Sequence, residues 1–74
     1  MGLASNLKRL RKDACLTQKE LAEKLGLSLS SIISYENGVR SPNAKALVKL
    51  ESYFQVNGEY LFSEYRPNEI DNYM

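Results

Sequence analysis

Residues 17–38, TQKELAEKLGLSLSSIISYENG, decide the fold of this 74-residue chain. Thr17 and Glu20 have the spacing of a capping box, in which each side chain accepts a hydrogen bond from the other residue's backbone amide. Gly26 falls where that helix must end, and glycine tolerates the positive φ of a tight turn. Ser28 is a good cap for a following helix. The segment is therefore predicted to form two short helices joined by a tight turn.

The second of these helices, predicted from Leu29 to Asn37, has a weak intrinsic preference for helix. Serines and β-branched isoleucines fill its middle, and neither favours a helix strongly. Ile32 and Tyr35 are expected to hold it against a core, and Gly38 to end it. A weak helix former kept on a scaffold indicates that its exposed face has another role.

Apolar periodicity predicts one helix before this pair. The helix is expected to begin with Ser5 as its cap and to end near Asp13. Its apolar face consists of Leu3, Leu7, Leu10 and Ala14.

Two more helices are predicted after the pair. Ser41 and Pro42 have the order of a cap and a first helical residue, so they predict the start of a fourth helix. Its apolar positions are Ala44, Leu47, Val48, Leu50 and Phe54. Asn57 or Gly58 is expected to start a short fifth helix. The fold class is thus all-α, with one domain over residues 1–62 and a polar tail or linker over residues 63–74.

The composition argues against several classes of function. Cys15 is the only cysteine and the chain has no histidine, so an internal disulfide, a zinc site and a histidine-based catalytic triad all lack ligands. Cys15 is expected to be a small packed residue. No apolar run reaches membrane-spanning length, and the first residues lack a signal-peptide pattern. We expect no cofactor, no metal, no membrane partner and no enzyme activity.

Charge is distributed unevenly along the chain. Residues 1–50 hold nine Lys or Arg against four acidic residues, a net +5, and residues 51–74 hold one against five, a net −4. Such an asymmetry favours a basic part that meets a polyanion and an acidic part that faces elsewhere. A chance distribution is the alternative.

From about Leu7 to Phe62, the chain resembles the phage repressor and Cro type of helix-turn-helix DNA-binding domain, the Xre family. The matching positions are Thr17-Gln18, Leu21-Ala22, Gly26, Ser28, Ile32, Tyr35-Glu36-Asn37-Gly38 and Pro42. The resemblance implies a compact five-helix bundle of the lambda-repressor-like type, with the helix-turn-helix at about 17–38. It also implies a transcriptional regulator, most simply a repressor, that binds double-stranded DNA as a dimer on a two-fold operator. Such a protein would be cytoplasmic, bacterial or phage-encoded, and nucleoid-associated.

The resemblance assigns roles to particular residues. The helix Leu29 to Asn37 would enter the major groove. Its candidate base contacts are Leu29, Ser30 and Ser34. The candidate contacts to the DNA backbone are Gln18, Ser28, Ser31, Asn37, Arg40 and Asn43. Arg11 and Glu36 match a pair that forms a structural salt bridge in relatives.

The chain departs from the family pattern in its base-reading positions. Relatives often place Gln, Arg or Lys at the positions of Leu29 and Ser34, and a polar residue at that of Ile33. Leucine can only touch a thymine methyl or pack on a sugar, and one hydroxyl cannot make a bidentate contact. We therefore expect weak direct readout, with affinity resting on phosphates, dimerisation and DNA shape.

The apolar residues leave a second function class open. Leu29 and Ile33 could equally bind a protein, and six of the seven aromatic residues follow Glu51. Aromatic side chains are enriched at subunit contacts, and the candidate dimer interface is Tyr60, Phe62 and Tyr65. The alternative function is an antitoxin or adaptor that docks a protein partner through its acidic, aromatic segment 51–74.

Overall fold

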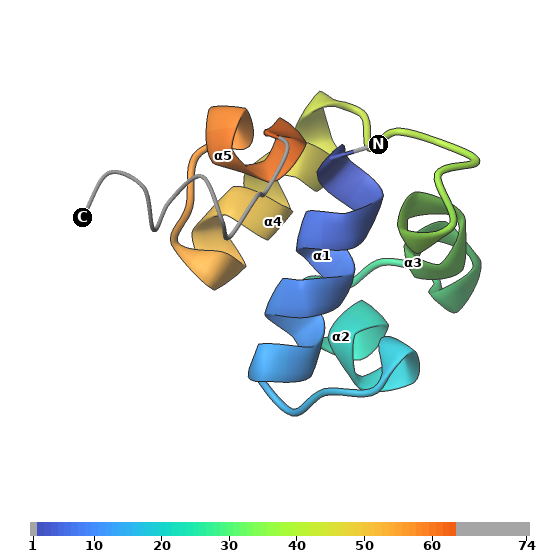
Figure 1. Ribbon diagram of the computed structural model, residues 1–74. Helices are drawn as coiled ribbons and strands as arrows, with labels where there is room; N and C mark the ends of the chain where they lie inside the picture. Colours follow the sequence, from blue (N-terminus) through green and yellow to red (C-terminus); the bar gives the residue numbers. More distant parts are fainter. Residues whose placement is uncertain (1, 64–74) are drawn as a thin grey trace.

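A computed structural model describes residues 2–63, which form five helices and no strand (Figure 1). The helices are α1 (Gly2–Asp13), α2 (Gln18–Leu25), α3 (Leu29–Glu36), α4 (Ala44–Phe54) and α5 (Gly58–Phe62). The all-α prediction is confirmed. The predicted tail lies, apart from Ser63, outside the described residues, and so does Tyr65.

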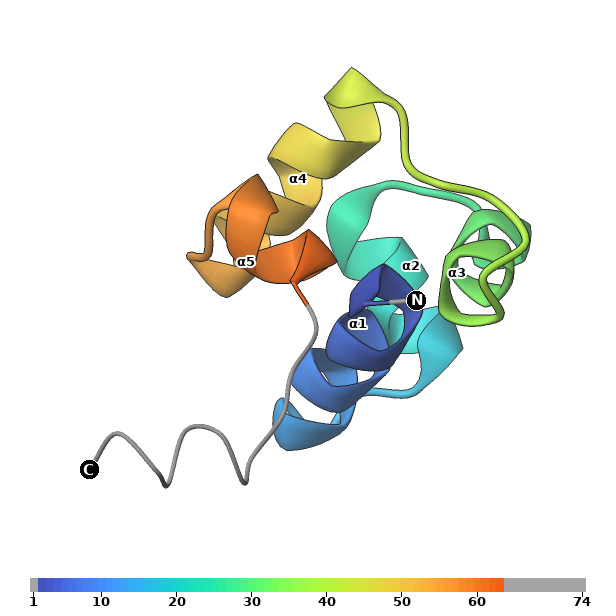
Figure 2. The same ribbon diagram turned by 45° about the horizontal axis from the view of Figure 1, so that its top comes forward.

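One apolar core joins the helices. Helix α1 packs on α3 and α5, and α2 packs on α3 and α4. Each helix contributes buried side chains, and the core consists of Leu3, Leu7, Leu21, Ala22, Leu25, Ile32, Tyr35, Ala46, Leu50 and Leu61. Figures 1 and 2 show α2 and α3 side by side, with a long connection leading from α3 to α4.

The caps predicted around α2 and α3 are confirmed. The Thr17 hydroxyl accepts from the Glu20 amide at 3.0 Å, and the Glu20 carboxylate accepts from the Thr17 amide at 2.8 Å. Gly26 ends α2 with a φ of +68°, in the left-handed region that side chains rarely adopt. Ser28 caps α3 by accepting from the Ser31 amide at 3.1 Å. The tight turn therefore has the predicted chemistry.

Helix α1 begins earlier than predicted, and Ser5 does not cap it. The helix starts at Gly2, so Ser5 is an exposed residue within its first turns. The early start lets Leu3 reach the core, where it is buried. It also brings Gly2 against the end of α5, where an added Cβ would collide with the carbonyl oxygens of Phe62 and Ser63.

Helix α4 begins later than predicted, and its cap is Asn43 rather than Ser41. The Asn43 side-chain oxygen accepts from the Ala46 amide at 2.8 Å, so Pro42 precedes the helix. Val48 was expected on the apolar face, but it is 57% exposed. It lies about 200° around the helix from the buried Ala46, because successive residues turn by about 100°.

Two further expectations about single residues are wrong. Cys15 is exposed and has a φ of +60°, because it forms the turn after α1 instead of packing between helices. Ala14 is likewise exposed, since α1 ends at Asp13 before the apolar face can continue.

Asn6 was not predicted as part of the core, yet it is 1% exposed. Its amide nitrogen donates to three carbonyl oxygens at the end of α5, those of Tyr60 (3.1 Å), Leu61 (3.0 Å) and Ser63 (2.7 Å). Unpaired carbonyls are expected at the end of a helix. Asn6 therefore fastens the last helix to the first.

Candidate nucleic-acid interface

Helix α3 divides into a buried face and an exposed face. Ile32, Tyr35 and Glu36 are buried, as expected for residues that hold a weak helix former in place. Ser30 is exposed, and Leu29 and Ile33 keep 41% and 37% of their surface exposed. The helix thus presents a mixed polar and apolar surface outward.

The first turn of α3 carries a cluster of hydrogen-bonding groups, Ser28, Ser31 and Arg40. The Ser28 hydroxyl donates to the Ser31 hydroxyl at 2.9 Å, and an Arg40 Nη donates to the same Ser31 oxygen at 3.1 Å. The guanidinium carbon of Arg40 also lies 6.0 Å from the centre of the Tyr35 ring. The Arg40 guanidinium therefore lies beside the N-terminus of α3, where the free backbone amides and the helix dipole also favour an anion.

The connection from α3 to α4 follows the helix back toward this cluster. The amides of Val39 and Arg40 both donate to the Ser34 carbonyl, at 2.9 and 3.3 Å. The predicted helix included Asn37, but α3 ends at Glu36 and Asn37 is its C-terminal cap. These bonds fix the course of the chain that positions Arg40.

The predicted salt bridge between Arg11 and Glu36 is present and bidentate. Arg11 Nε and Nη2 donate to the two Glu36 carboxylate oxygens at 2.6 and 3.1 Å, and the Glu36 side chain is fully buried. The hydrogen bonds that Arg11 donates to the Glu36 carboxylate raise the pKa of Arg11, so the guanidinium stays charged. Arg11 also donates to the Leu16 carbonyl at 2.8 Å. The pair ties α1 to α3 and to the turn before α2.

Gln18 joins this network, a contact that the sequence did not reveal. Its side-chain nitrogen donates to a Glu36 oxygen at 3.1 Å. The bond links the first residue of α2 to the last residue of α3. Gln18 and Glu36 are 18 positions apart, and no local signal predicts such a pair.

The remaining predicted contacts differ in how free their side chains are. Ser28, Ser30, Asn37, Arg40 and Asn43 are exposed, whereas Gln18, Ser31 and Ser34 are half-buried. Direct bonds join Ser28, Ser31 and Arg40 into one group, and Gln18 belongs to the separate network around Glu36. The contacts to DNA themselves stay predictions.

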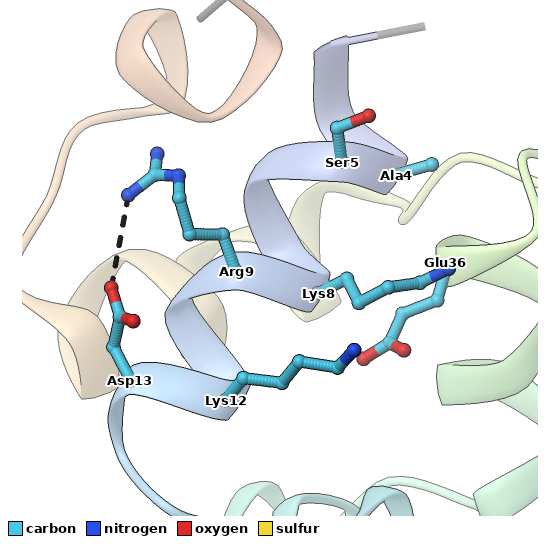
Figure 3. Close-up of a pocket in the computed structure, with 7 residues that line it drawn as sticks. All are labelled: Ala4, Ser5, Lys8, Arg9, Lys12, Asp13 and Glu36. Carbon is cyan, nitrogen blue, oxygen red and sulfur yellow. Dashed lines mark ion pairs between the residues drawn. The ribbon is translucent and has the colours of Figure 1, made fainter. Parts of the chain in front are cut away.

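A depression of about 420 Å³ lies along α1, and its lining includes Glu36 at the end of α3. Figure 3 shows Lys8 and Lys12 on the side of α1 toward Glu36, and Arg9 and Asp13 on the other side. The lining of this depression also includes Lys8, Arg9 and Lys12. Among residues 2–63 no group of three or more His, Cys, Asp or Glu could hold a metal ion, and no helix has the length and apolar character needed to span a membrane.

Comparison with known proteins identifies a family and several relatives, including a bacterial regulator and a phage repressor. The family described as Helix-turn-helix matches residues 7–61. The HTH-type transcriptional regulator ImmR of Bacillus subtilis is 36% identical over 74 residues, covering 96% of this chain and 58% of ImmR. The cryptic phage CTXphi transcriptional repressor RstR of Vibrio cholerae is 29% identical over 65 residues, covering 88% of this chain and 59% of RstR. The chain thus spans little more than half the length of these relatives.

The fold also matches a solved structure. The crystal structure of a transcriptional regulator from Listeria innocua superposes with a TM-score of 0.74 at 24% identity, over 96% of this chain and 70% of that one. This likeness supports the arrangement of the helices alone.

Proposed function

The chain belongs to the helix-turn-helix family, and we propose that it is a DNA-binding transcriptional regulator, most simply a repressor. The observation that carries the proposal is the exposed face of α3 beside the hydrogen-bonded group of Ser28, Ser31 and Arg40. Phage and bacterial regulators among its relatives support the same role.

In this proposal α3 lies in the major groove. Its eight residues give a rod about 12 Å long, comparable to the width of that groove. Leu29, Ser30 and Ser34 face base edges, as the resemblance implies. Because two of these three carry only a hydroxyl, base discrimination by hydrogen bonds is weak.

Contacts to the phosphates supply most of the affinity. Arg40 is already held at the first turn of α3 by its hydrogen bond to Ser31, so little side-chain freedom is lost on binding. Ser28, Ser31, Asn37 and Asn43 add uncharged donors. The half-buried Gln18 is the first residue of α2, where the free backbone amides of a helix N-terminus favour a phosphate. Lysines and arginines dominate residues 1–50, where the net charge is +5, which favours the approach of DNA.

A second copy of the chain is the proposed partner on DNA. Phe62 is 46% exposed at the end of α5, and Tyr60 beside it is 36% exposed. Tyr60 is also fixed in place, because its hydroxyl accepts from an Arg9 Nη at 2.6 Å. These aromatic residues form the proposed dimer interface together with Tyr65, which lies outside the described residues. Two copies would then read two half-sites about one helical turn apart.

In-vitro selection of duplexes from a random pool, followed by fluorescence anisotropy at several salt concentrations, tests the proposal. We expect salt-sensitive binding to a pseudo-two-fold site with half-sites about 10 base pairs apart, centre to centre. A chain that binds no selected duplex in a salt-sensitive way is not a DNA-binding regulator.

The alternative, an antitoxin or adaptor, draws support from the exposed apolar side chains of Leu29, Ile33 and Phe62. It makes an opposite mutational prediction. Arg40→Ala and Ser30→Ala would leave the function intact, and Tyr60→Ala would abolish it. Loss of function in Arg40→Ala with retention in Tyr60→Ala excludes this alternative.

A further inference from the structure

Leu29 and Ile33 form an apolar pair on one flank of α3. They are 41% and 37% exposed, and residues four apart on a helix lie on the same side, one turn along. Ser30 and Ser34 follow around the helix, and Ser31 lies on the opposite flank with its bond to Arg40. Going around its exposed side, α3 therefore presents an apolar edge, a row of hydroxyls and an edge that carries the Arg40 cation.

We infer that Leu29 and Ile33 read the C5-methyl groups of thymines in the major groove, an inference that rests on the proposed DNA-binding function. The C5-methyl of thymine is the one apolar group that the four bases present in that groove. A leucine and an isoleucine have no polar atom to offer a base edge, so this group is the one they can recognise. The pair thus supplies the sequence preference that the serines cannot.

DNA fits the pair better than an apolar protein surface does. The other flank of α3 is formed by Ser31, with its cap Ser28 and Arg40 of the following connection bonded to it. Burying these groups against an apolar partner would strip them of water without a counter-charge. A duplex offers phosphates to that flank and methyl groups to the other. Both flanks are then satisfied at once.

The spacing of the pair sets which thymines are read. Four residues of helix advance by about 6 Å, and successive nucleotides of one strand advance by about 3.4 Å. Leu29 and Ile33 therefore reach methyl groups about two base pairs apart when the helix runs along the groove. A half-site selected by this protein should contain thymines with that separation.

Replacing thymine by deoxyuridine tests the inference, because it removes only the methyl group and leaves base pairing unchanged. A duplex from the selection is remade with deoxyuridine at one thymine at a time, and the dissociation constant is measured by anisotropy. We expect about a four-fold loss of affinity at one or two positions in each half-site, which corresponds to about 0.8 kcal/mol, the value for one buried CH₂-sized group. Every other deoxyuridine should have little effect.

Protein variants assign the methyl groups to side chains. In Leu29→Ala, and separately in Ile33→Ala, the loss caused by deoxyuridine at the matching position should shrink toward one-fold. Val48→Ala is the matched control, because Val48 is an exposed apolar residue on α4, and it should keep the four-fold loss. Unfolding followed by circular dichroism checks that each variant is folded.

Three outcomes overturn the inference. Equal affinity for all deoxyuridine duplexes, with salt-sensitive binding intact, would refute methyl readout and leave DNA binding standing. A methyl effect that persists in both alanine variants would show that these side chains do not carry it. Binding to no selected duplex would overturn the proposed function together with this inference.

Discussion

Replacing Arg11 with alanine should destabilise the fold by about 3 kcal/mol, because it leaves the buried Glu36 carboxylate without its charged partner. The Glu36 side chain is fully buried and that of Arg11 is 12% exposed. Breaking a buried pair costs about 3–5 kcal/mol, and the partial exposure of Arg11 favours the lower end of that range. Gln18 would remain as a hydrogen-bond donor to Glu36, but a neutral amide cannot replace a guanidinium.

The loss is large for a chain of this size. A stability of about 0.05–0.15 kcal/mol per residue gives about 4–11 kcal/mol for 74 residues. At about 4–8 °C per kcal/mol, the melting temperature should fall by about 12–24 °C. Urea unfolding followed by circular dichroism measures the change, and an unaltered m-value shows that both proteins unfold between the same states.

Two further variants separate the buried pair from a general effect of charge. Asp13→Ala is the matched control, because Asp13 is 71% exposed and its oxygen lies 4.0 Å from Arg9; its cost should stay within about 0.5 kcal/mol. The double variant Arg11→Met with Glu36→Gln should cost about 1–3 kcal/mol less than the sum of its single variants. Additive costs, or an Arg11→Ala variant within about 1 kcal/mol of the parent, would refute this reasoning.

Three other perturbations test the local features of the fold. Asn6→Ala should cost about 3 kcal/mol in urea unfolding, because it leaves the Leu61 and Ser63 carbonyls at the end of α5 without their side-chain donor; a cost below about 1 kcal/mol would mean that water replaces the amide. Gly26→Ala should cost about 1–2 kcal/mol, since alanine is strained at a φ of +68°, and an unchanged melting temperature would contradict the left-handed turn. Hydrogen bonds from the backbone amide and the side chain of Thr17 lower the pKa of Glu20 below its ordinary value. The Glu20 carboxylate therefore stabilises the fold above its unfolded-state pKa, and this stabilisation is lost as the pH falls through the folded-state pKa. Glu20→Gln should therefore make the acid limb of the stability curve shallower, and an NMR titration that finds the Glu20 pKa at or above its ordinary value would exclude the effect.

Local chemistry was predictable from the sequence around the turn. The capping box at Thr17, the left-handed Gly26 and the cap at Ser28 each depend on residues within four positions of one another, and all were found where predicted. Ile32 and Tyr35 were also correctly placed in the core. The Arg11 and Glu36 pair was predictable only through the family resemblance, because 25 positions separate the two residues.

The wrong predictions concern helix starts at which neighbouring residues compete as caps, and side chains whose partners lie far along the chain. Ser5 and Ser41 are both reasonable caps. Helix α1 nevertheless begins before Ser5, with Leu3 buried in the core, and α4 begins after Ser41, with Asn43 as its cap. Asn6 was not predicted as part of the core, because its three partners lie at the end of α5, more than 50 positions away. Sequence patterns within one helix contain no information about such partners.

The candidate interface combines both kinds of information. Its place on the exposed face of α3 followed from the family pattern, whereas the fixed position of Arg40 over the first turn depends on the course of the connection to α4. The apolar pair Leu29 and Ile33 looked like a deficiency in base reading when considered position by position. On the folded helix the two residues lie on one edge, and the proposed readout of thymine methyl groups rests on that arrangement.

The salt dependence of DNA binding by Arg40→Ala tests the central claim most directly. If Arg40 neutralises a phosphate beside α3, the slope of log affinity against log salt concentration should become shallower by about 0.9 relative to the parent chain. Lys8→Ala removes the same charge from the exposed surface of α1 and should leave that slope unchanged. Equal slopes for the parent and Arg40→Ala, or the same reduction in both variants, would contradict the claim that the Arg40 edge of α3 faces DNA.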